Sequence, residues 1–388
     1  MNKAVITKIN QINMLFVYEE NQLVECYPLL ENQSIKIDDI YVGRVEKVVK
    51  NIQSAFIRLD DEHVGYLPLD DKPYIVLNRT LPKGLSSIAE NDLILVQVEQ
   101  EAQKMKQPRV TGNIRLGGLN CVLDLYSGKS GISKKIKNRE RVNELQNLIP
   151  KNGPYGCILR TACENVQNEE ILTEYKRLSQ EFDQIIHTAQ FTKKRGCIYK
   201  GKEDYISILE AYGRTRLHEI VCDDEMIYDT LMKNQFSNVT LYKDEYPLCK
   251  LFSLETELSH ILSKKVWLKS GGFLIIEPTE AMVVIDVNTG KSIGKKDRDK
   301  HILKINLEAA IEITRQIRLR NLSGIIMIDF INMQDKTNKE QIAKVIERQL
   351  SKDKVPGYLV DITKLDIFEL TRKKIRKPIH EILGNEYR

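Results

Sequence analysis

Two apolar runs of this chain each end at an aspartate. Residues 281–285 lead into Asp286, and residues 324–328 lead into Asp329. The segment between them carries apolar residues at helical spacing over 306–320, so the pattern predicts a strand, a crossover helix and a second strand. That arrangement places both carboxylates at or near one edge of a sheet, where they can share a hard cation such as Mg²⁺.

Each aspartate taken alone also fits a simpler interpretation, in which a polar residue caps the loop that follows a buried strand. The pair, with Asn288 two positions after Asp286, favours a metal site instead. Oxygen ligands are the ones that Mg²⁺ prefers, and one or two carboxylates are its usual share from a protein.

Length and composition limit the class of protein. A chain of 388 residues with 42% hydrophobic content can bury several cores. No apolar stretch reaches the length of a membrane span, and the N-terminus lacks the pattern of a signal peptide. The seven cysteines form no CxxC pair, which argues against a zinc ribbon and a disulfide framework. We therefore expect a cytoplasmic protein with reduced thiols.

The positive charge is concentrated late in the chain. Residues 291–388 hold 22 basic and 14 acidic residues, whereas the preceding part holds 37 and 40. Basic runs at 291–300 and 372–377 lie beside or after the two aspartates in the sequence. Each run alone fits a solvated face. Together with an acidic metal site, they predict a phosphodiester substrate.

The hydrophobic pattern predicts an α+β protein of several domains. Short strands over 4–27 are too few for a domain and are expected to join a sheet completed by residues 205–265. Strands near 40–49, 54–59, 65–69 and 93–98 resemble a small five-stranded barrel of the oligonucleotide-binding (OB) type. On that barrel, bases could stack on Phe56 and Tyr66, or these side chains could belong to the barrel core.

Four longer motifs resemble one known family. They are Ile285–Gly290 (IDVNTG), Asn306–Ala310 (NLEAA), Gly324–Ile331 (GIIMIDFI) and Leu365–Lys373 (LDIFELTRK). Together they are similar to the catalytic core of the ribonuclease E/G family, and the resemblance extends over nearly the whole chain.

The resemblance implies a fold with four parts. A split ribonuclease-H-like subdomain would occupy residues 1–35 and 205–262. An RNA-binding barrel of the S-one type (36–113) and a sensor of the RNA 5′ end (114–204) would be inserted in it. An α/β DNase-I-like catalytic subdomain would follow at 263–388.

The resemblance also implies site residues. Asp286 and Asp329 would coordinate Mg²⁺, Asn288 would orient the site, and Glu280 would act from behind the metal ligands. Other matching positions would contact RNA. These are Arg160 and Thr161, which would grip a 5′-monophosphate with backbone help from Gly131 and Ile132, the stacking pair Phe56 and Tyr66, and the basic Lys106.

The implied activity is that of a Mg²⁺-dependent endoribonuclease acting on single-stranded RNA, favoured by a 5′-monophosphate, in messenger decay and in ribosomal and transfer RNA processing. Water would attack the phosphodiester and leave a 5′-phosphate and a 3′-hydroxyl. The six histidines show no catalytic spacing, which disfavours cleavage through a cyclic phosphate. The competing hypothesis is a non-catalytic RNA-binding protein on the same scaffold.

Two positions depart from the family pattern. Asn332 stands where the family usually has a second aspartate, three residues after the later ligand. The last cysteine is Cys249, so the family's Cys-Pro-x-Cys zinc link is missing from this sequence. We expect a short form of the family without a zinc-linked dimer, and any homo-oligomer would have to form in another way.

Overall fold

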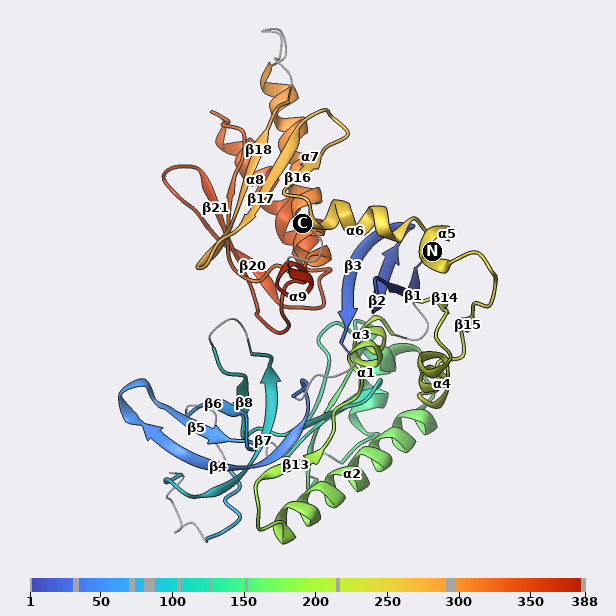
Figure 1. Ribbon diagram of the computed structural model, residues 1–388, viewed down its shortest axis with the longest axis vertical. Coiled ribbons are helices and arrows are strands. Elements are labelled where there is room, and N and C mark those ends of the chain that lie inside the picture. Colours follow the sequence, from blue (N-terminus) through green and yellow to red (C-terminus); the bar gives the residue numbers. More distant parts are fainter. Residues whose placement is uncertain are drawn as a thin grey trace. The chain divides into compact units, whose positions relative to one another are not determined.

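The computed structural model describes residues 2–30, 35–69, 74–79, 88–102, 106–125, 128–150, 153–213, 217–290 and 298–384. The chain forms two compact units (Figure 1). Unit 1 comprises residues 1–31 and 214–388, and unit 2 comprises residues 32–213. Within the described ranges, no helix is both long enough and apolar enough to cross a membrane.

The first sheet of unit 1 is built from both of that unit's chain segments. Its strand order is β15-β14-β1-β2-β3. The strands are β1 (Lys3–Ile9), β2 (Ile12–Glu19), β3 (Gln22–Leu29), β14 (Glu219–Cys222) and β15 (Val239–Leu241). β1 to β3 are antiparallel, and β14 joins β1 in parallel. The expectation that residues near 205–265 complete the N-terminal sheet is therefore correct (Figure 1).

Tight turns explain how so short a stretch makes three strands. Both hairpin loops, Asn10–Gln11 and Glu20–Asn21, have positive φ at each residue. This is the conformation of the two-residue hairpins whose twist matches that of the flanking strands. Helices that accompany this sheet are α4 (Glu225–Lys233), α5 (Leu248–Leu251) and α6 (Leu254–Leu262).

The second sheet of unit 1 carries the two aspartates. Its order is β16-β17-β18-β19-β21-β20. The strands are β16 (Lys265–Trp267), β17 (Phe273–Pro278), β18 (Met282–Asn288), β19 (Gly324–Asp329), β20 (Gly357–Ile362) and β21 (Ile367–Arg372). The predicted strand, helix and strand are β18, α7 (Arg298–Leu319) and β19, with β18 and β19 parallel.

Among the described residues, helices cover one face of this second sheet. α7 and α8 (Lys336–Leu350) lie along that face of the sheet (Figure 1). Their apolar sides pack on alternate strand residues such as Ile285 and Ile328, both fully buried. The residues between them point to the other face, where several large apolar side chains are exposed. We call this the open face of the sheet.

A buried ion cluster joins α7 to the first sheet of unit 1. The Arg318 guanidinium is 2.9 Å from Glu25 and 2.7 Å from Glu19. Arg318 and Glu25 are both buried, and charges away from water persist only when paired. Apolar residues of α9 (Ile379–Leu383) join the same core from the chain's later part.

Unit 2 contains the expected barrel. Its strands are β4 (Ile40–Val49), β5 (Ser54–Arg58), β6 (Val64–Pro68), β7 (Leu93–Gln100) and β8 (Arg109–Thr111). They follow one another in the order β4-β5-β6-β8-β7, and a β4–β7 pairing closes the ring. The prediction of a five-stranded closed barrel is confirmed, and the barrel is consistent with an OB-type domain. The described part of the protein is a mixed α/β structure.

The rest of unit 2 is a smaller sheet with helices. The order β11-β12-β10-β9 joins strands β9 (Arg115–Gly117), β10 (Cys121–Asp124), β11 (Ser130–Ile132) and β12 (Gly156–Leu159). The helices of this part are α1 (Arg139–Gln146), α2 (Asn168–Phe191) and α3 (Asp204–Tyr212), and β13 (Gly196–Tyr199) adds to β4. α2 packs Leu178 and Phe182 into this core, as its helical spacing predicts.

Candidate functional site

Asp286 and Asp329 lie side by side on neighbouring strands. They are direct partners in the parallel register of β18 and β19, so their backbones are about 4.8 Å apart. Both side chains are exposed on the open face, because the residues flanking them along each strand point into the helix-covered core. The convergence expected from the sequence is therefore present.

The electrostatics of the pair suit a cation. Loss of hydration, and then the negative charge of Asp286, raise the pKa of Asp329 above its ordinary value. Within the described ranges, no lysine or arginine forms a salt bridge with either carboxylate. Two adjacent carboxylates without a basic partner repel one another, and a divalent ion removes that repulsion.

Asn288 completes the immediate site. Its side-chain amide donates a 2.7 Å hydrogen bond to Oδ2 of Asp286. The bond uses one carboxylate oxygen and holds the group in one orientation, leaving Oδ1 and the Asp329 oxygens as ligands. All available donors are oxygens, which fits Mg²⁺ rather than a softer metal. No group of three or more His, Cys, Asp or Glu at metal-binding spacing exists among the described residues, so the site offers two carboxylates.

Polar residues of α7 hold the loops around this site. Asn306 is fully buried and bonds the Ile331 backbone twice, accepting from its N–H at 3.1 Å and donating to its carbonyl at 2.7 Å. This fixes the segment that directly follows Asp329. The Glu308 carboxylate accepts from the backbone N–H groups of Lys269 and Ser270. Both residues lie inside a motif quoted above, but the sequence analysis did not predict these hydrogen bonds. A polar side chain among the apolar residues of a helix was the signal that could have indicated them.

Two glycines permit close backbone packing beside Asn288. A Cβ on Gly272 would lie 2.7 Å from the Asn288 carbonyl, and one on Gly290 would lie 2.2 Å from the Gly271 carbonyl. Gly290 also has a positive φ of 71°, which disfavours other residues. The turn before β17 can therefore lie against the end of β18.

Glu280 does not join the site. It lies in the turn between β17 and β18, where Thr279 bonds Met282, at the opposite end of the strand from Asp286. Met282 and Asp286 are four residue steps apart along β18, about 13 Å. The expectation that Glu280 acts from behind the metal ligands is therefore wrong. Asn332, in contrast, is exposed in the loop that follows Asp329.

The start of one of the two basic runs lies away from the carboxylates. Arg372 is buried and pairs with Asp353 at 2.8 Å, so its role is structural. Its β19 partner is Gly324, at the far end of the strand from Asp329, so the 372–377 run does not begin beside the carboxylates. Of the 291–300 run, residues 291–297 lie outside the described residues.

The four expected 5′-sensor residues come together in unit 2. Gly131 and Ile132 lie on β11, whose partner β12 leads directly into Arg160 and Thr161. The Arg160 guanidinium donates to the Gly118 carbonyl at 2.6 Å, and the Thr161 hydroxyl is 3.0 Å from that of Ser133. No atom lies within 4 Å of a Cβ placed on Gly131, so the backbone there is open to a ligand.

The barrel residues form an aromatic pair outside the core. Phe56 and Tyr66 are cross-strand partners with ring centroids 6.1 Å apart in an edge-to-face arrangement. Both are half-buried and absent from the barrel's buried core, so the alternative that they are core residues is wrong. Lys106 is exposed, and the exposed Lys47 pairs with Phe56 in register. The sequence interpretation missed Lys47.

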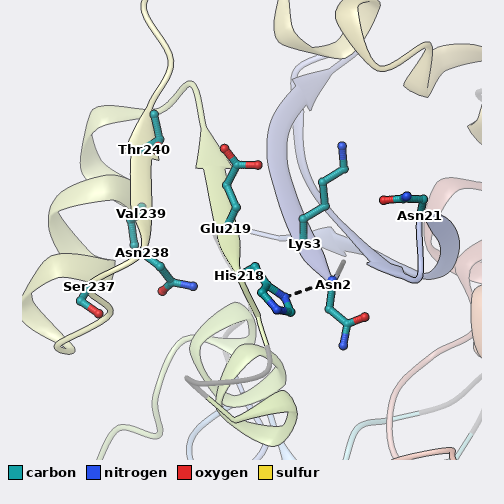
Figure 2. Close-up of a pocket in the computed structure, with 9 residues that line it drawn as sticks. All are labelled: Asn2, Lys3, Asn21, His218, Glu219, Ser237, Asn238, Val239 and Thr240. Carbon is teal, nitrogen blue, oxygen red and sulfur yellow. Dashed lines mark hydrogen bonds between the residues drawn. The ribbon is translucent and has the colours of Figure 1, made fainter.

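A cavity of about 540 Å³ lies at the β1–β14–β15 side of the first sheet of unit 1. Figure 2 shows His218 turned toward Asn2, whose backbone N–H donates to Nδ1 of the imidazole at 3.3 Å. Glu219 is the single carboxylate among its lining residues. The cavity includes none of the candidate residues and offers no paired acids.

Comparison with known proteins gives a consistent result. A model of the ribonuclease E/G family matches residues 116–375. Ribonuclease E of Nostoc sp. is 32% identical, over 99% of this chain and 58% of that protein. Ribonuclease G of Escherichia coli is 29% identical, over 90% and 75%. A ribonuclease E/G-like protein of Pyropia yezoensis is 30% identical, over 92% and 73%. The chain thus spans 58% of the length of the Nostoc and Synechocystis ribonucleases E.

Proposed function

This chain belongs to the ribonuclease E/G family, and we propose that it is a Mg²⁺-dependent endoribonuclease that hydrolyses single-stranded RNA. The observation that carries the proposal is the register of β18 and β19, which pairs Asp286 with Asp329 on an open face. Within the described residues these two neighbouring acids form no salt bridge, and their repulsion costs stability. Their presence together therefore favours a working nuclease site over a decayed one.

Asp286 and Asp329 would hold the metal, and Asn288 would keep the first carboxylate oriented through its hydrogen bond. When bound, Mg²⁺ supplies Lewis-acid chemistry and neutralises charge on a phosphodiester. Both carboxylates would be occupied as metal ligands, so no protein side chain is assigned as the nucleophile and the attacking group would be water. Its oxygen bonds to phosphorus, the bond from phosphorus to the 3′ oxygen breaks, and that oxygen receives a proton. The products carry a 5′-phosphate and a 3′-hydroxyl.

We further propose the family's division of the chain. The order β3-β2-β1-β14-β15, with three antiparallel and two parallel strands, supports a split ribonuclease-H-like subdomain at 1–35 and 205–262. The closed barrel supports an S-one type domain at 36–113, followed by a 5′ sensor at 114–204. The second sheet of unit 1, with helices on one face, would be the DNase-I-like subdomain at 263–388.

The RNA contacts follow from the same premise. Arg160 and Thr161, with the backbone of Gly131 and Ile132, would bind a 5′-monophosphate, since a guanidinium and a hydroxyl are natural partners of phosphate oxygens. Bases would stack on the half-exposed Phe56 and Tyr66, and exposed Lys106 would contact the phosphate backbone. The cellular role would be messenger decay and the processing of ribosomal and transfer RNA in the cytoplasm.

The test is cleavage of a 5′-monophosphorylated, A/U-rich single-stranded RNA. Wild-type protein with Mg²⁺ should give products with 5′-phosphate and 3′-hydroxyl ends. Asp286→Asn should remain folded and lose activity by about 100-fold or more. Asp229→Asn is the matched control, because Asp229 is an exposed aspartate of α4 in the same unit. Equal rates for wild type and Asp286→Asn would refute the catalytic role. Binding without any cleavage by wild type would favour a non-catalytic RNA-binding protein.

A further inference from the structure

The edge of the catalytic sheet carries an exposed aromatic cluster. Trp267 on β16 is the chain's single tryptophan, and 64% of its surface is exposed. Its ring centroid lies 5.3 Å from that of Phe273 on β17, at an interplanar angle of 62°. Lys265 places its ammonium 4.0 Å from the Trp267 centroid and 3.8 Å from the Phe273 centroid. We call Lys265, Trp267 and Phe273 the edge cluster.

The edge cluster shares the open face with the two aspartates. Trp267 pairs with Phe273, and Phe273 pairs with Asn288. One row along, Lys265 pairs with Ile275, which pairs with Asp286. Directly opposed residues of antiparallel strands project to the same face. Each strand step is about 4.8 Å, so Phe273 lies one step and Trp267 two steps from Asn288.

A role in packing does not account for the edge cluster. The residues that alternate with it, Val266 and Leu274, are the ones that pack into the core beneath α7. Trp267 lies instead on the side away from the helices, with most of its surface in water. A lysine ammonium over two rings contributes cation–π attraction and fixes the rings. The result is an ordered aromatic surface that remains exposed.

The chemistry of the edge cluster fits one type of ligand. An exposed indole offers a flat π-surface, and such surfaces stack nucleobases with little dependence on sequence. The Lys265 ammonium adds a positive charge for a phosphate on a face otherwise acidic at Asp286 and Asp329. When one phosphate of an RNA strand lies at the aspartates, the base of the neighbouring nucleotide would reach the edge cluster, which lies one to two strand spacings from Asn288.

We propose that the edge cluster is a base-stacking subsite for single-stranded RNA, which receives the base of a nucleotide flanking the phosphate to be cleaved. Trp267 and Phe273 provide the stacking surface, and Lys265 contacts the adjoining phosphate. The inference rests on the proposed endoribonuclease function, because the position of the cleaved phosphate is taken from Asp286 and Asp329.

The single tryptophan makes the proposal directly testable. The Asp286→Asn variant separates binding from cleavage. Titration of this variant with an unlabelled single-stranded RNA should change the fluorescence emission of Trp267 until binding saturates. Anisotropy of a labelled RNA measures binding independently. An RNA that binds without altering the emission would overturn the proposal, since a stacked base quenches or shifts an indole.

A mutational cycle measures the same contact. Trp267→Ala in the Asp286→Asn background should bind RNA about tenfold more weakly, and Trp267→Phe should recover most of the loss. A series of RNAs, each with one abasic nucleotide at a different position, locates the contact. The protein that retains Trp267 should bind one member of the series more weakly than the others, and this penalty should vanish in Trp267→Ala. Tyr358→Ala is the matched control, because Tyr358 is 63% exposed on β20 of the same sheet.

The outcomes distinguish the subsite from the proposed function. If wild type cleaves RNA but Trp267→Ala keeps normal affinity and its abasic penalty, the subsite is refuted while the endoribonuclease stands. If wild type does not cleave but the penalty disappears in Trp267→Ala, the endoribonuclease fails and the stacking contact stands as part of a binding protein.

Discussion

At the scale of single residues, the site depends on two acids that oppose each other. Asp286 and Asp329 are register partners, and Asn288 bonds only the first. Loss of hydration, and after it the negative charge of Asp286, raise the pKa of Asp329. Asn332, three positions after Asp329, is neutral and adds no negative charge there.

The raised pKa of Asp329 predicts a stability effect with a definite sign. A carboxyl group whose pKa is higher in the folded protein binds its proton more strongly there than in the unfolded chain. The free energy of unfolding then falls as the pH rises through the interval between the ordinary and the raised pKa. In EDTA at about pH 7, Asp329→Asn should therefore unfold at a higher temperature than wild type, and at about pH 3 the gain should be absent.

The measurement is thermal unfolding at the two pH values, with the exposed Asp229→Asn as the control that should show no gain. Excess Mg²⁺ should stabilise wild type and leave Asp329→Asn unchanged, because binding to the folded state raises its stability. A variant less stable than wild type in EDTA at both pH values would contradict the assigned repulsion.

At the scale of elements, α7 does more than connect β18 to β19. It covers the sheet, and it fixes the loop after Asp329 through the two bonds between Asn306 and the Ile331 backbone. The turn before β17 is fixed in the same way by Glu308. Polar groups of one helix thus hold two loops next to the carboxylates.

Asn306→Ala tests this role. The substitution leaves the Ile331 N–H and carbonyl without partners, and we expect a loss of about 1–3 kcal/mol in the free energy of unfolding. Cleavage should also fall under conditions where the variant is folded, because the segment after Asp329 is released. Urea unfolding and cleavage rates measure the two effects. A loss below about 0.5 kcal/mol, the range of ordinary surface changes, with normal cleavage would show that these bonds are dispensable.

The sequence predicted those elements whose signals are local. The β18–α7–β19 unit, the barrel strands and α2 follow from apolar periodicity, and the pairing of Asp286 with Asp329 follows from the parallel strands. The failures concern long-range contacts. Glu280 is near Asp286 in sequence, but an extended strand carries it to the opposite end. Arg372 reads as part of a basic run, but Asp353 pairs with it inside the fold. Periodicity contains no information on such partners.

At the scale of the whole molecule, candidate RNA contacts occur in both units. Unit 1 holds the carboxylates and the edge cluster, whereas unit 2 holds the aromatic pair of the barrel and the expected 5′-sensor residues. The residues of the sensor, 131–132 and 160–161, are separate in sequence and meet only because β11 pairs with β12. The family resemblance predicted this grouping, whereas composition and periodicity did not.

Arg160→Ala tests whether recognition of the RNA 5′ end affects cleavage of the same RNA. The guanidinium is anchored on the Gly118 carbonyl at 2.6 Å, and a charge-assisted bond to phosphate contributes about 1.5–3 kcal/mol. Cleavage of a 5′-monophosphorylated RNA should therefore fall by roughly 10- to 100-fold, while the same RNA with a 5′-hydroxyl should be cleaved as before. A uniform loss on both substrates would refute a sensor of the 5′ end.

The central claim is that Asp286 and Asp329 together hold a divalent cation, and Mn²⁺ is a direct reporter of it because its free and bound forms differ in electron paramagnetic resonance. With an uncleavable RNA present, wild type should bind Mn²⁺ in competition with Mg²⁺, and both Asp286→Asn and Asp329→Asn should lose that binding while Asp229→Asn keeps it. Unchanged Mn²⁺ binding in either of the first two variants would contradict the account.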